Sequence, residues 1–342
     1  MNGIKRGFVT AKLRLSVMAA CFIAAGMISS RDVMAQTPAA ALLVLNKADN
    51  SLAIVDPASG KAVGRVPTGV GPHEVVASSD GKFAFVTNYG DREGGTTLSM
   101  IDLAAQKETR RVALGALRRP HGIIFADGKV YFTAELNKLI ARYDPAADRV
   151  DWMMGTGQDY THMLVASKDL RQIFTANIGS DSVTAIDRAA DNNGFKETLI
   201  AVGKGPEGID ISPDGKEVWV ANSSDGTVSI IDTATHKVVQ TLDVKTKHSN
   251  RLKFTLDGTL VLVSDAGSDD VVVLEAATRK ERKRIKVGRV PEGILMEPSG
   301  ARAYVAASQD NSVAVIDLQT LEVVNHIATG HDPDGLAWAQ PR

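Results

Sequence analysis

Seven polar residues recur along the chain in equivalent sequence contexts, five of them directly after a proline. They are His73, His121, His162, Glu207, Asn250, Glu292 and Asp334. Imidazole and carboxylate groups are the ligands that Zn²⁺, Cu²⁺, Mn²⁺ and Fe²⁺ take in proteins. If the fold gathers these residues, the three histidines could hold one such ion. An ion with an open fourth position would also polarise a carbonyl or lower the pKa of a bound water.

A repeated block of sequence must position these residues. An acidic residue that ends a β-branched run recurs at intervals of 42 to 46 residues, as Asp56, Asp102, Asp144, Asp187, Asp232, Glu275 and Asp317. Within one block, the runs 218–221 and 228–231 are too short for helices and are bounded by turns containing Gly and Asp. Such a period, with several strands per unit, is typical of a propeller blade. We predict an all-β, seven-bladed β-propeller with four antiparallel strands per blade.

The two ends of the repeat are complementary. The last copy ends with an inner strand, Asp334–Ala339, whereas the first copy supplies only the outer strands Leu42–Asn46, Leu52–Val55 and Ala62–Val66. We expect these segments to form one blade, which closes the ring and removes exposed sheet edges. Since inner strands line the channel of a propeller, the seven polar residues should form one ring at a channel mouth.

Several roles remain open for this ring. Glu207 or Glu292 could act as general base beside a metal-bound water. His248, His326 and His331 lie near the same strand ends and could support the site. Glu135 departs from the small or amide residues that otherwise end the second strand of each block. Polar residues after a turn proline also suit a solvated channel mouth that binds nothing, so a structural role is not excluded.

The first 35 residues do not fit the repeat. They have a basic start, an apolar run over 15–28 and a small-residue cleavage site at Val33-Met34-Ala35. We predict a cleaved signal peptide over 1–35, a short linker over 36–41 and one propeller domain over 42–339. Cleavage ahead of Cys21 is disfavoured because only about six apolar residues would precede it. Export would place the mature protein in the periplasm, without a transmembrane segment.

Composition argues against several classes of function. Without residues 1–35 the chain has 34 Lys and Arg against 39 Asp and Glu, a net charge of −5. Nonspecific nucleic-acid binding is therefore not expected, because it depends on basic contacts to phosphate. Cys21 is the only cysteine, so the mature chain would have no disulfide or thiolate ligand. The sequence contains neither a G-x-S-x-G nucleophile elbow nor a Gly-rich phosphate loop.

The repeat itself resembles a known family. The segments FVTNYG, LSMIDLAAQKETRRVALG and VWVANSSDGTVSIIDTATHKVVQTLDV are similar to the YVTN-repeat (YncE-like) β-propeller family, and the resemblance covers residues 42–338. It implies an exported protein of the bacterial or archaeal periplasm or cell surface. Propellers that look similar include lactonases, metal-dependent lyases with His and Glu at the channel mouth, and subunits of periplasmic quinoprotein systems. The fold alone does not fix a reaction.

We therefore expect a monomeric periplasmic binding module. Its channel mouth would hold a small molecule, one divalent metal ion (Zn, Cu, Mn or Fe) or a periplasmic protein partner. The alternative is a metal-dependent enzyme, either a lactonase-type hydrolase or a lyase. That enzyme would use the same ring of residues, with His73, His121 and His162 as metal ligands and Glu207 and Glu292 as catalytic candidates.

Overall fold

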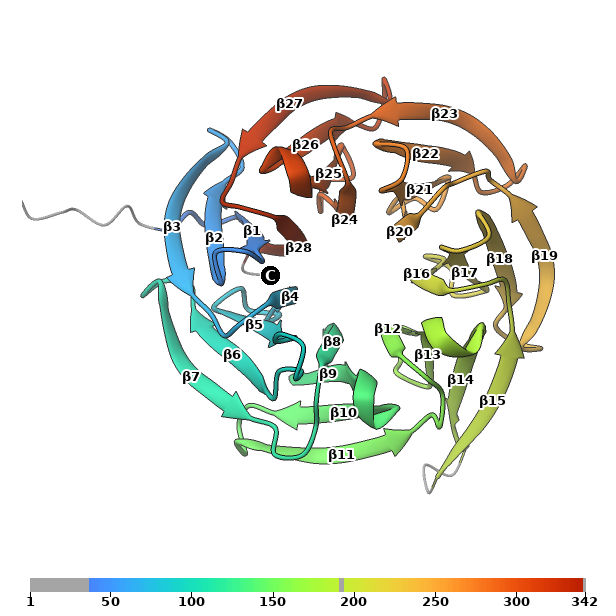
Figure 1. Cartoon of the computed structure of the whole chain (residues 1–342), viewed down its shortest axis with the longest axis horizontal. Coiled ribbons are helices and arrows are strands. Elements are labelled where there is room, and N and C mark those ends of the chain that lie inside the picture. The colour runs from blue at the N-terminus through green and yellow to red at the C-terminus, as the bar shows by residue number, and fades with distance from the viewer. Residues whose placement is uncertain (1–36, 191–193, 341–342) are drawn as a thin grey trace, which may run out of the picture. The chain divides into compact units, whose positions relative to one another are not determined.

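The computed structural model describes residues 37–190 and 194–340. These residues form seven four-stranded antiparallel sheets arranged as blades around one axis (Figure 1). The predicted all-β, seven-bladed propeller is therefore confirmed. In each blade an inner strand lies at the axis and an outer strand at the circumference (Figure 1). The predicted signal peptide, together with Gln36, lies outside the described residues.

We number the blades in chain order from the first whose strands are consecutive, and give the strands from the axis outward. Blade 1 contains β4 (Pro72–Ala77), β5 (Phe83–Asn88), β6 (Thr97–Asp102) and β7 (Lys107–Ala113), and blade 2 contains β8 (Pro120–Ala126), β9 (Lys129–Ala134), β10 (Leu139–Asp144) and β11 (Arg149–Gly155). Blade 3 contains β12 (Thr161–Ala166), β13 (Gln172–Asn177), β14 (Ser182–Arg188) and β15 (Phe195–Ala201), and blade 4 contains β16 (Pro206–Ile211), β17 (Glu217–Asn222), β18 (Thr227–Asp232) and β19 (Lys237–Asp243). Blade 5 contains β20 (Ser249–Phe254), β21 (Leu260–Asp265), β22 (Asp270–Glu275) and β23 (Lys280–Lys286), and blade 6 contains β24 (Pro291–Met296), β25 (Arg302–Ala307), β26 (Ser312–Asp317) and β27 (Glu322–Ala328). Blade 7 contains β28 (Pro333–Ala339), β1 (Ala41–Asn46), β2 (Ser51–Asp56) and β3 (Lys61–Pro67).

Blade 7 joins the two ends of the repeat, as the sequence predicts. Strand β28 is its inner strand and pairs antiparallel with β1, with Ala339 opposite Ala41 and Ala337 opposite Leu43. The other three strands of the blade come from the beginning of the repeat. The ring is thus closed by backbone hydrogen bonds between segments nearly 300 residues apart, and neither end of the repeat is left as an incomplete blade.

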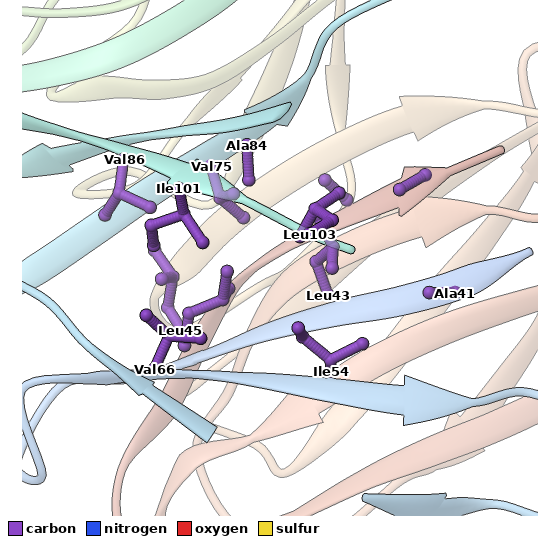
Figure 2. Close-up of a cluster of buried hydrophobic side chains, with 13 residues drawn as sticks. Ala41, Leu43, Leu45, Ile54, Val66, Val75, Ala84, Val86, Ile101 and Leu103 are labelled. Atoms are coloured by element: carbon purple, nitrogen blue, oxygen red, sulfur yellow. The ribbon is translucent and has the colours of Figure 1, made fainter. Parts of the chain in front are cut away.

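The burial of each strand follows its sequence. Strand β22, DVVVLE, carries a continuous apolar run and is buried on both faces, whereas the outer strand β27, EVVNHIA, is mostly exposed. Adjacent blades pack face to face, and between blades 7 and 1 the side chains of Leu43 and Leu45 meet Val86 and Ile101 (Figure 2). Burying one such side chain stabilises the fold by about 1.5–3 kcal/mol, so each interface between blades is a hydrophobic core of its own.

Helices are minor elements in the described residues. They are three 3-10 turns of three residues each, η1 (Glu135–Asn137), η2 (Ile178–Ser180) and η3 (Ser308–Asp310). Each connects the second and third strands of its blade. No helix within residues 37–190 and 194–340 is long and apolar enough to span a membrane.

Candidate functional site

All seven residues predicted for the channel mouth lie at the start of an inner strand, where the sheet register is interrupted. We call these seven residues the mouth ring. In every blade the pairing of the inner strand shifts after its first residue, for example between Pro120 and Ile123 in blade 2 and between Pro206 and Ile209 in blade 4. A β-bulge takes residues out of the hydrogen-bonded ladder and redirects their side chains. The same local irregularity therefore presents one polar side chain per blade.

Inner strands approach one another closely just after the mouth ring. Four blades have glycine at the next position, and a Cβ added there would lie 2.2–2.7 Å from the backbone of the neighbouring inner strand: Gly122, Gly208, Gly293 and Gly335. No side chain fits at such a distance without a shift of the backbone. The other three blades carry Glu74, Met163 and Arg251 at this position.

The structure brings the three predicted histidines into one stack. The ring centroids of His73 and His121 are 4.2 Å apart, and those of His121 and His162 are 3.7 Å apart. The ring of Tyr89 packs edge-on against His73 and His121, with centroids 5.2 and 5.4 Å away. Three imidazoles from consecutive blades therefore pack against one another, although 41 or more residues separate them in sequence.

Each outer histidine has a buried carboxylate beside Nδ1; for His162 the contact is a hydrogen bond, and for His73 it is an ion-pair contact without hydrogen-bond geometry. His73 Nδ1 lies 2.7 Å from Asp334 Oδ2, and His162 Nδ1 lies 2.5 Å from Glu135 Oε1. Asp334 and Glu135 are 0% and 2% exposed. The second oxygen of Glu135 accepts a hydrogen bond of 2.7 Å from the Tyr89 hydroxyl. A carboxylate on one ring nitrogen fixes the tautomer and orientation of a histidine and leaves the other nitrogen free to bind. The Nε2 atom of His162 is indeed buried without a partner in the described structure.

The middle histidine, His121, is fully buried and differs from its neighbours. Neither of its ring nitrogens has a hydrogen-bond partner among the described residues. Burial first, and then the proximity of His162 and His73, holds the pKa of His121 well below its ordinary value, so this imidazole is neutral at pH 7. A buried polar atom without a partner costs about 1–3 kcal/mol. Such a cost in a native protein calls for an explanation, and an ordered water or a bound ion would supply one.

The opposite side of the mouth ring is closed by an ion pair across the axis. Arg251, only 3% exposed, binds Glu74 from a blade that is not its neighbour; its Nε lies 3.1 Å from Glu74 Oε1. Arg251 also donates to the Asn250 side chain at 2.9 Å, and Asn250 donates to Glu207 Oε1 at 2.9 Å. The same Glu207 oxygen lies 3.9 Å from His162 Nε2. Glu207 thus connects the hydrogen-bonded side of the ring with the histidine stack.

A second group of charges surrounds Lys47. Its Nζ lies 2.9 Å from Glu292 Oε2 and 3.4 Å from Asp334 Oδ2. Burial and the neighbouring Asp334 raise the pKa of Glu292 to about 8, although Lys47 acts in the opposite direction. Burial alone would raise the pKa of Asp334, but its electrostatic interactions with His73 and Lys47 hold that pKa below its ordinary value. Asp334 therefore remains a carboxylate while Glu292 can carry a proton near neutral pH.

Sequence reasoning placed the mouth ring but missed four residues that complete it. Glu74 and Arg251 directly follow mouth-ring residues, at the position where glycine is commonest. Lys47 and Tyr89 directly follow the second strand of their blades, as Glu135 does. Aligning the repeats at the residue after the second strand would have identified Lys47, Tyr89 and Glu135 together. The remaining histidines considered as support have other surroundings: His248 contacts Ser223, His331 contacts Asp49, and His326 lies on the outer strand β27.

The charge and donor types at this site favour a cation. The mouth ring and its neighbours present four carboxylates and one carboxyl group that can be protonated near neutral pH, against two basic side chains. The carboxylates are Glu74, Glu135, Glu207 and Asp334, the protonatable group is Glu292, and the basic side chains are Lys47 and Arg251. The donor atoms form two groups, and within each group they lie within 4.8 Å of one another. One group is His73, Glu74 and His121, and the other is His121, Glu135 and His162. Neutral imidazole nitrogens beside carboxylates are suitable ligands for Zn²⁺, Cu²⁺, Mn²⁺ or Fe²⁺.

Family models match two overlapping parts of the chain. The model described as YNCE-like beta-propeller matches residues 10–202, and the model described as Cytochrome D1 heme domain matches residues 154–303. The uncharacterized protein YncE of Salmonella typhimurium is 27% identical over 181 residues, which are 51% of this chain and 50% of YncE. The chain thus matches about half the length of this relative.

Two further proteins resemble nearly the whole propeller. Protein NirF of Pseudomonas aeruginosa is 24% identical over 324 residues, covering 84% of this chain and 78% of NirF. The periplasmic gluconolactonase PpgL of Pseudomonas aeruginosa superposes with a TM-score of 0.71 at 18% identity, covering 89% of this chain and 99% of PpgL. At this identity the structural likeness establishes a common fold and no common activity.

Proposed function

This chain belongs to the YncE-like β-propeller family, and we propose that it binds a divalent transition-metal ion at the mouth of its central channel. The ligands are His73, His121 and His162. The observation that carries this proposal is the set of partners around the ring nitrogens of the outer histidines. A buried carboxylate lies beside Nδ1 of His73 and of His162, both rings pack against His121, and Nε2 of His162 is buried without a partner among the described residues.

That arrangement is the one that proteins use to orient histidine ligands. Carboxylate partners of metal-binding histidines fix the tautomer, raise the basicity of the binding nitrogen and typically change metal affinity 10–100-fold. His121 adds a neutral imidazole, the protonation state that a metal requires. The surplus of carboxylates around the stack lowers the electrostatic cost of introducing a divalent cation. Geometry and charge therefore support the same class of ligand.

Metal titration of the purified protein tests this proposal. The protein is stripped with a chelator, analysed for residual metal, and titrated with Zn²⁺, Cu²⁺ and Mn²⁺ while its melting temperature is recorded. At an ion concentration of 100 Kd, binding should stabilise the fold by about 2.7 kcal/mol. His73→Ala, His121→Ala and His162→Ala should each lose this stabilisation. His331→Ala, which removes a 72% exposed side chain paired with Asp49, is the matched control and should retain it.

A protein that is isolated without metal and melts at the same temperature in all three ions would contradict the proposal. The absorption spectrum of the same preparation gives a second check, because one matching family model is named for a heme domain. A Soret band of stoichiometric intensity would indicate that these histidines bind a metal-tetrapyrrole and not a free metal ion.

The second candidate is a metal-dependent enzyme, a lactonase-type hydrolase or a lyase, at the same site. Glu207 favours it, because its carboxylate lies 3.9 Å from His162 Nε2 and could accept a proton from a water bound near that nitrogen. Glu292, which can be protonated near neutral pH, would serve as acid. Turnover of simple lactones by the metal-loaded protein, abolished by Glu207→Gln, would support the enzyme. Metal binding without turnover would contradict the enzyme and support the binding module.

We also infer that the protein acts in the periplasm as a monomer, with a small molecule or a periplasmic protein as partner. The basic and apolar composition of residues 1–35 supports export, and one structural relative is described as periplasmic. Mass spectrometry of the exported protein should find an N-terminus at Gln36. Gel filtration should give the mass of one mature chain, and a larger species would contradict the monomer.

A further inference from the structure

The residue that directly follows the second strand has the same place in every blade. Its backbone N–H donates, at 2.8–3.1 Å, to the carbonyl of the residue two positions ahead of the mouth-ring residue of that blade. We call the seven residues at this position the second ring: Lys47, Tyr89, Glu135, Ile178, Ser223, Ala266 and Ser308. Only its members in blades 7, 1 and 2 have long polar side chains, and each of these three contacts a mouth-ring residue.

Tyr89 is the member of the second ring that reaches all three histidines of the stack. Its aromatic ring packs edge-on against His73 and His121, with centroids 5.2 and 5.4 Å away. Its hydroxyl donates at 2.7 Å to Glu135 Oε2, and the other oxygen of that carboxylate lies 2.5 Å from His162 Nδ1. One side chain therefore contacts two of the proposed metal ligands directly and the third through Glu135.

The hydroxyl of Tyr89 is one of two partners that fix the Glu135 carboxylate. Glu135 is 2% exposed, and its side chain has hydrogen bonds only to Tyr89 and His162 among the described residues. Without the hydroxyl, Oε2 would be buried and unpaired, which costs free energy. The carboxylate would then be free to rotate, and His162 would lose part of the contact that fixes its tautomer and orientation.

The backbone around Tyr89 is itself held on two sides. Residues 89–96 join the second and third strands of blade 1, whereas four residues join these strands in every other blade. The Tyr89 N–H donates to Gly71 O at 2.9 Å, and the Tyr89 carbonyl accepts from Gly95 N at 2.5 Å. A Cβ on Gly95 would lie 1.9 Å from the Asn88 carbonyl oxygen, so the long loop folds back tightly against the end of β5. The insertion in blade 1 therefore holds Tyr89 in place.

We propose that Tyr89 is a positioning residue of the metal site, which holds His73 and His121 with its ring and His162 through Glu135. This inference rests on the proposed metal-binding function and adds a residue that binds no metal itself. Carboxylate partners of histidine ligands change metal affinity by about 10–100-fold. Since Tyr89 acts on such a partner from one step further out, its hydroxyl contributes about 10-fold, the lower end of that range.

The variant Tyr89→Phe tests this role, because it keeps the aromatic ring and removes the hydroxyl. The affinity for Zn²⁺ is measured by competition with a chromophoric chelator, and the visible spectrum of bound Co²⁺ reports the geometry of its ligands. We expect the affinity to fall about 10-fold and the Co²⁺ spectrum to change.

Tyr143→Phe is the matched control. Tyr143 is 0% exposed, and its hydroxyl also donates to a carboxylate, Asp148 Oδ1, at 2.8 Å. Tyr143 lies near the end of β10, whereas the second ring precedes the start of that strand, so this hydrogen bond is at the opposite rim. Its loss removes the same kind of contact, and it should leave the Zn²⁺ affinity and the Co²⁺ spectrum unchanged.

A double variant tests the route through Glu135. If Tyr89 acts through this carboxylate, adding Tyr89→Phe to Glu135→Gln should cause little further loss of affinity. Losses that simply add would contradict the proposed route.

The outcomes separate this inference from the proposed function. Unchanged Zn²⁺ affinity and an unchanged Co²⁺ spectrum in Tyr89→Phe would overturn the inference and leave the metal site standing. Equal losses in Tyr89→Phe and Tyr143→Phe would also overturn it, because a general loss of stability would then explain both. A wild-type protein that binds no stoichiometric ion would overturn both proposals.

Discussion

The two halves of the mouth ring occupy equivalent positions in the fold but differ in how their polar groups are satisfied. In blades 4 to 6 the carboxyl groups have hydrogen-bonded partners, Glu207 with Asn250 and Glu292 with Lys47. Asp334 in blade 7 contacts both Lys47 and His73, without a hydrogen bond among the described residues. In blades 1 to 3 the ring consists of imidazoles, and nitrogens of His121 and His162 are buried without partners. Native proteins satisfy most buried polar groups, so the second half is where a ligand is expected.

This difference distinguishes polar residues that stabilise the fold from polar residues that bind a ligand within the same ring. Each blade builds the position in the same way, with a bulge at the start of its inner strand. What differs is the surrounding chemistry. Lys47 and Arg251 belong to blades 7 and 5 and offset carboxylates, whereas Glu135 and Asp334 lie beside Nδ1 of the outer histidines. The paired half should therefore govern stability and the histidine half should govern binding.

The largest expected effect on stability comes from breaking the paired half. Arg251→Met leaves the Glu74 carboxylate buried without its cation, and we expect a loss of about 3–5 kcal/mol. Urea denaturation monitored by circular dichroism measures it. The double variant Arg251→Met with Glu74→Leu removes both charges and should recover most of the loss. If the double variant is as unstable as the single one, the contribution comes from packing rather than from the ion pair.

Metal affinity should respond to the histidine half instead. Glu135→Gln weakens the hold on His162 Nδ1, and the affinity for Zn²⁺ should fall by about 10–100-fold, as measured by competition with a chromophoric chelator. Glu292→Gln is the comparison in the paired half and should leave the affinity nearly unchanged. Equal losses in the two variants would remove the distinction between the halves.

The close approach of the inner strands predicts an intermediate effect. A Cβ on Gly122 would lie 2.6 Å from the backbone oxygen of His162, so Gly122→Ala must displace the strand that carries this histidine. We expect a destabilisation of about 1–3 kcal/mol, measured by thermal unfolding. Gly194→Ala, at a position with no atom within 4 Å of the added Cβ, should change stability by no more than about 0.5 kcal/mol. Comparable losses of stability in Gly122→Ala and Gly194→Ala would show that the inner strands are not closely packed at Gly122.

The paired half also predicts a pH dependence of stability. The pKa of Glu292 is raised to about 8, so between its ordinary value and pH 8 the folded state holds a proton that the unfolded state has released. This residue therefore stabilises the fold at low pH, and its contribution declines as the pH rises. Glu292→Gln should lose less stability than the wild type between pH 5 and pH 9. Parallel stability profiles would show that Glu292 does not titrate in this range.

Much of the fold and part of the site could be predicted from the sequence. The acidic residue that ends each third strand, from Asp56 to Asp317, repeats at a spacing that only a few architectures allow, and it gave the number of blades. The prolines before residues such as His121 and Glu207 marked the inner strands. Glu135 was recognisable as a departure from the repeat. Its partners, His162 and Tyr89, were not identified as such, because they belong to the two blades on either side of its own.

The sequence by itself determined the strands, the turns, the closure of blade 7 and the presence of three histidines at one rim. These depend on short-range preferences and hydrophobic patterns, repeated seven times, so a few irregular copies do not obscure them. Only the tertiary structure decided which side chains of different blades meet. Arg251 and Glu74 are 177 residues apart, and Lys47 and Glu292 are 245 apart. Contacts of this kind depend on distances of a few ångströms between inner strands, which the packing of whole blades sets and no local pattern records.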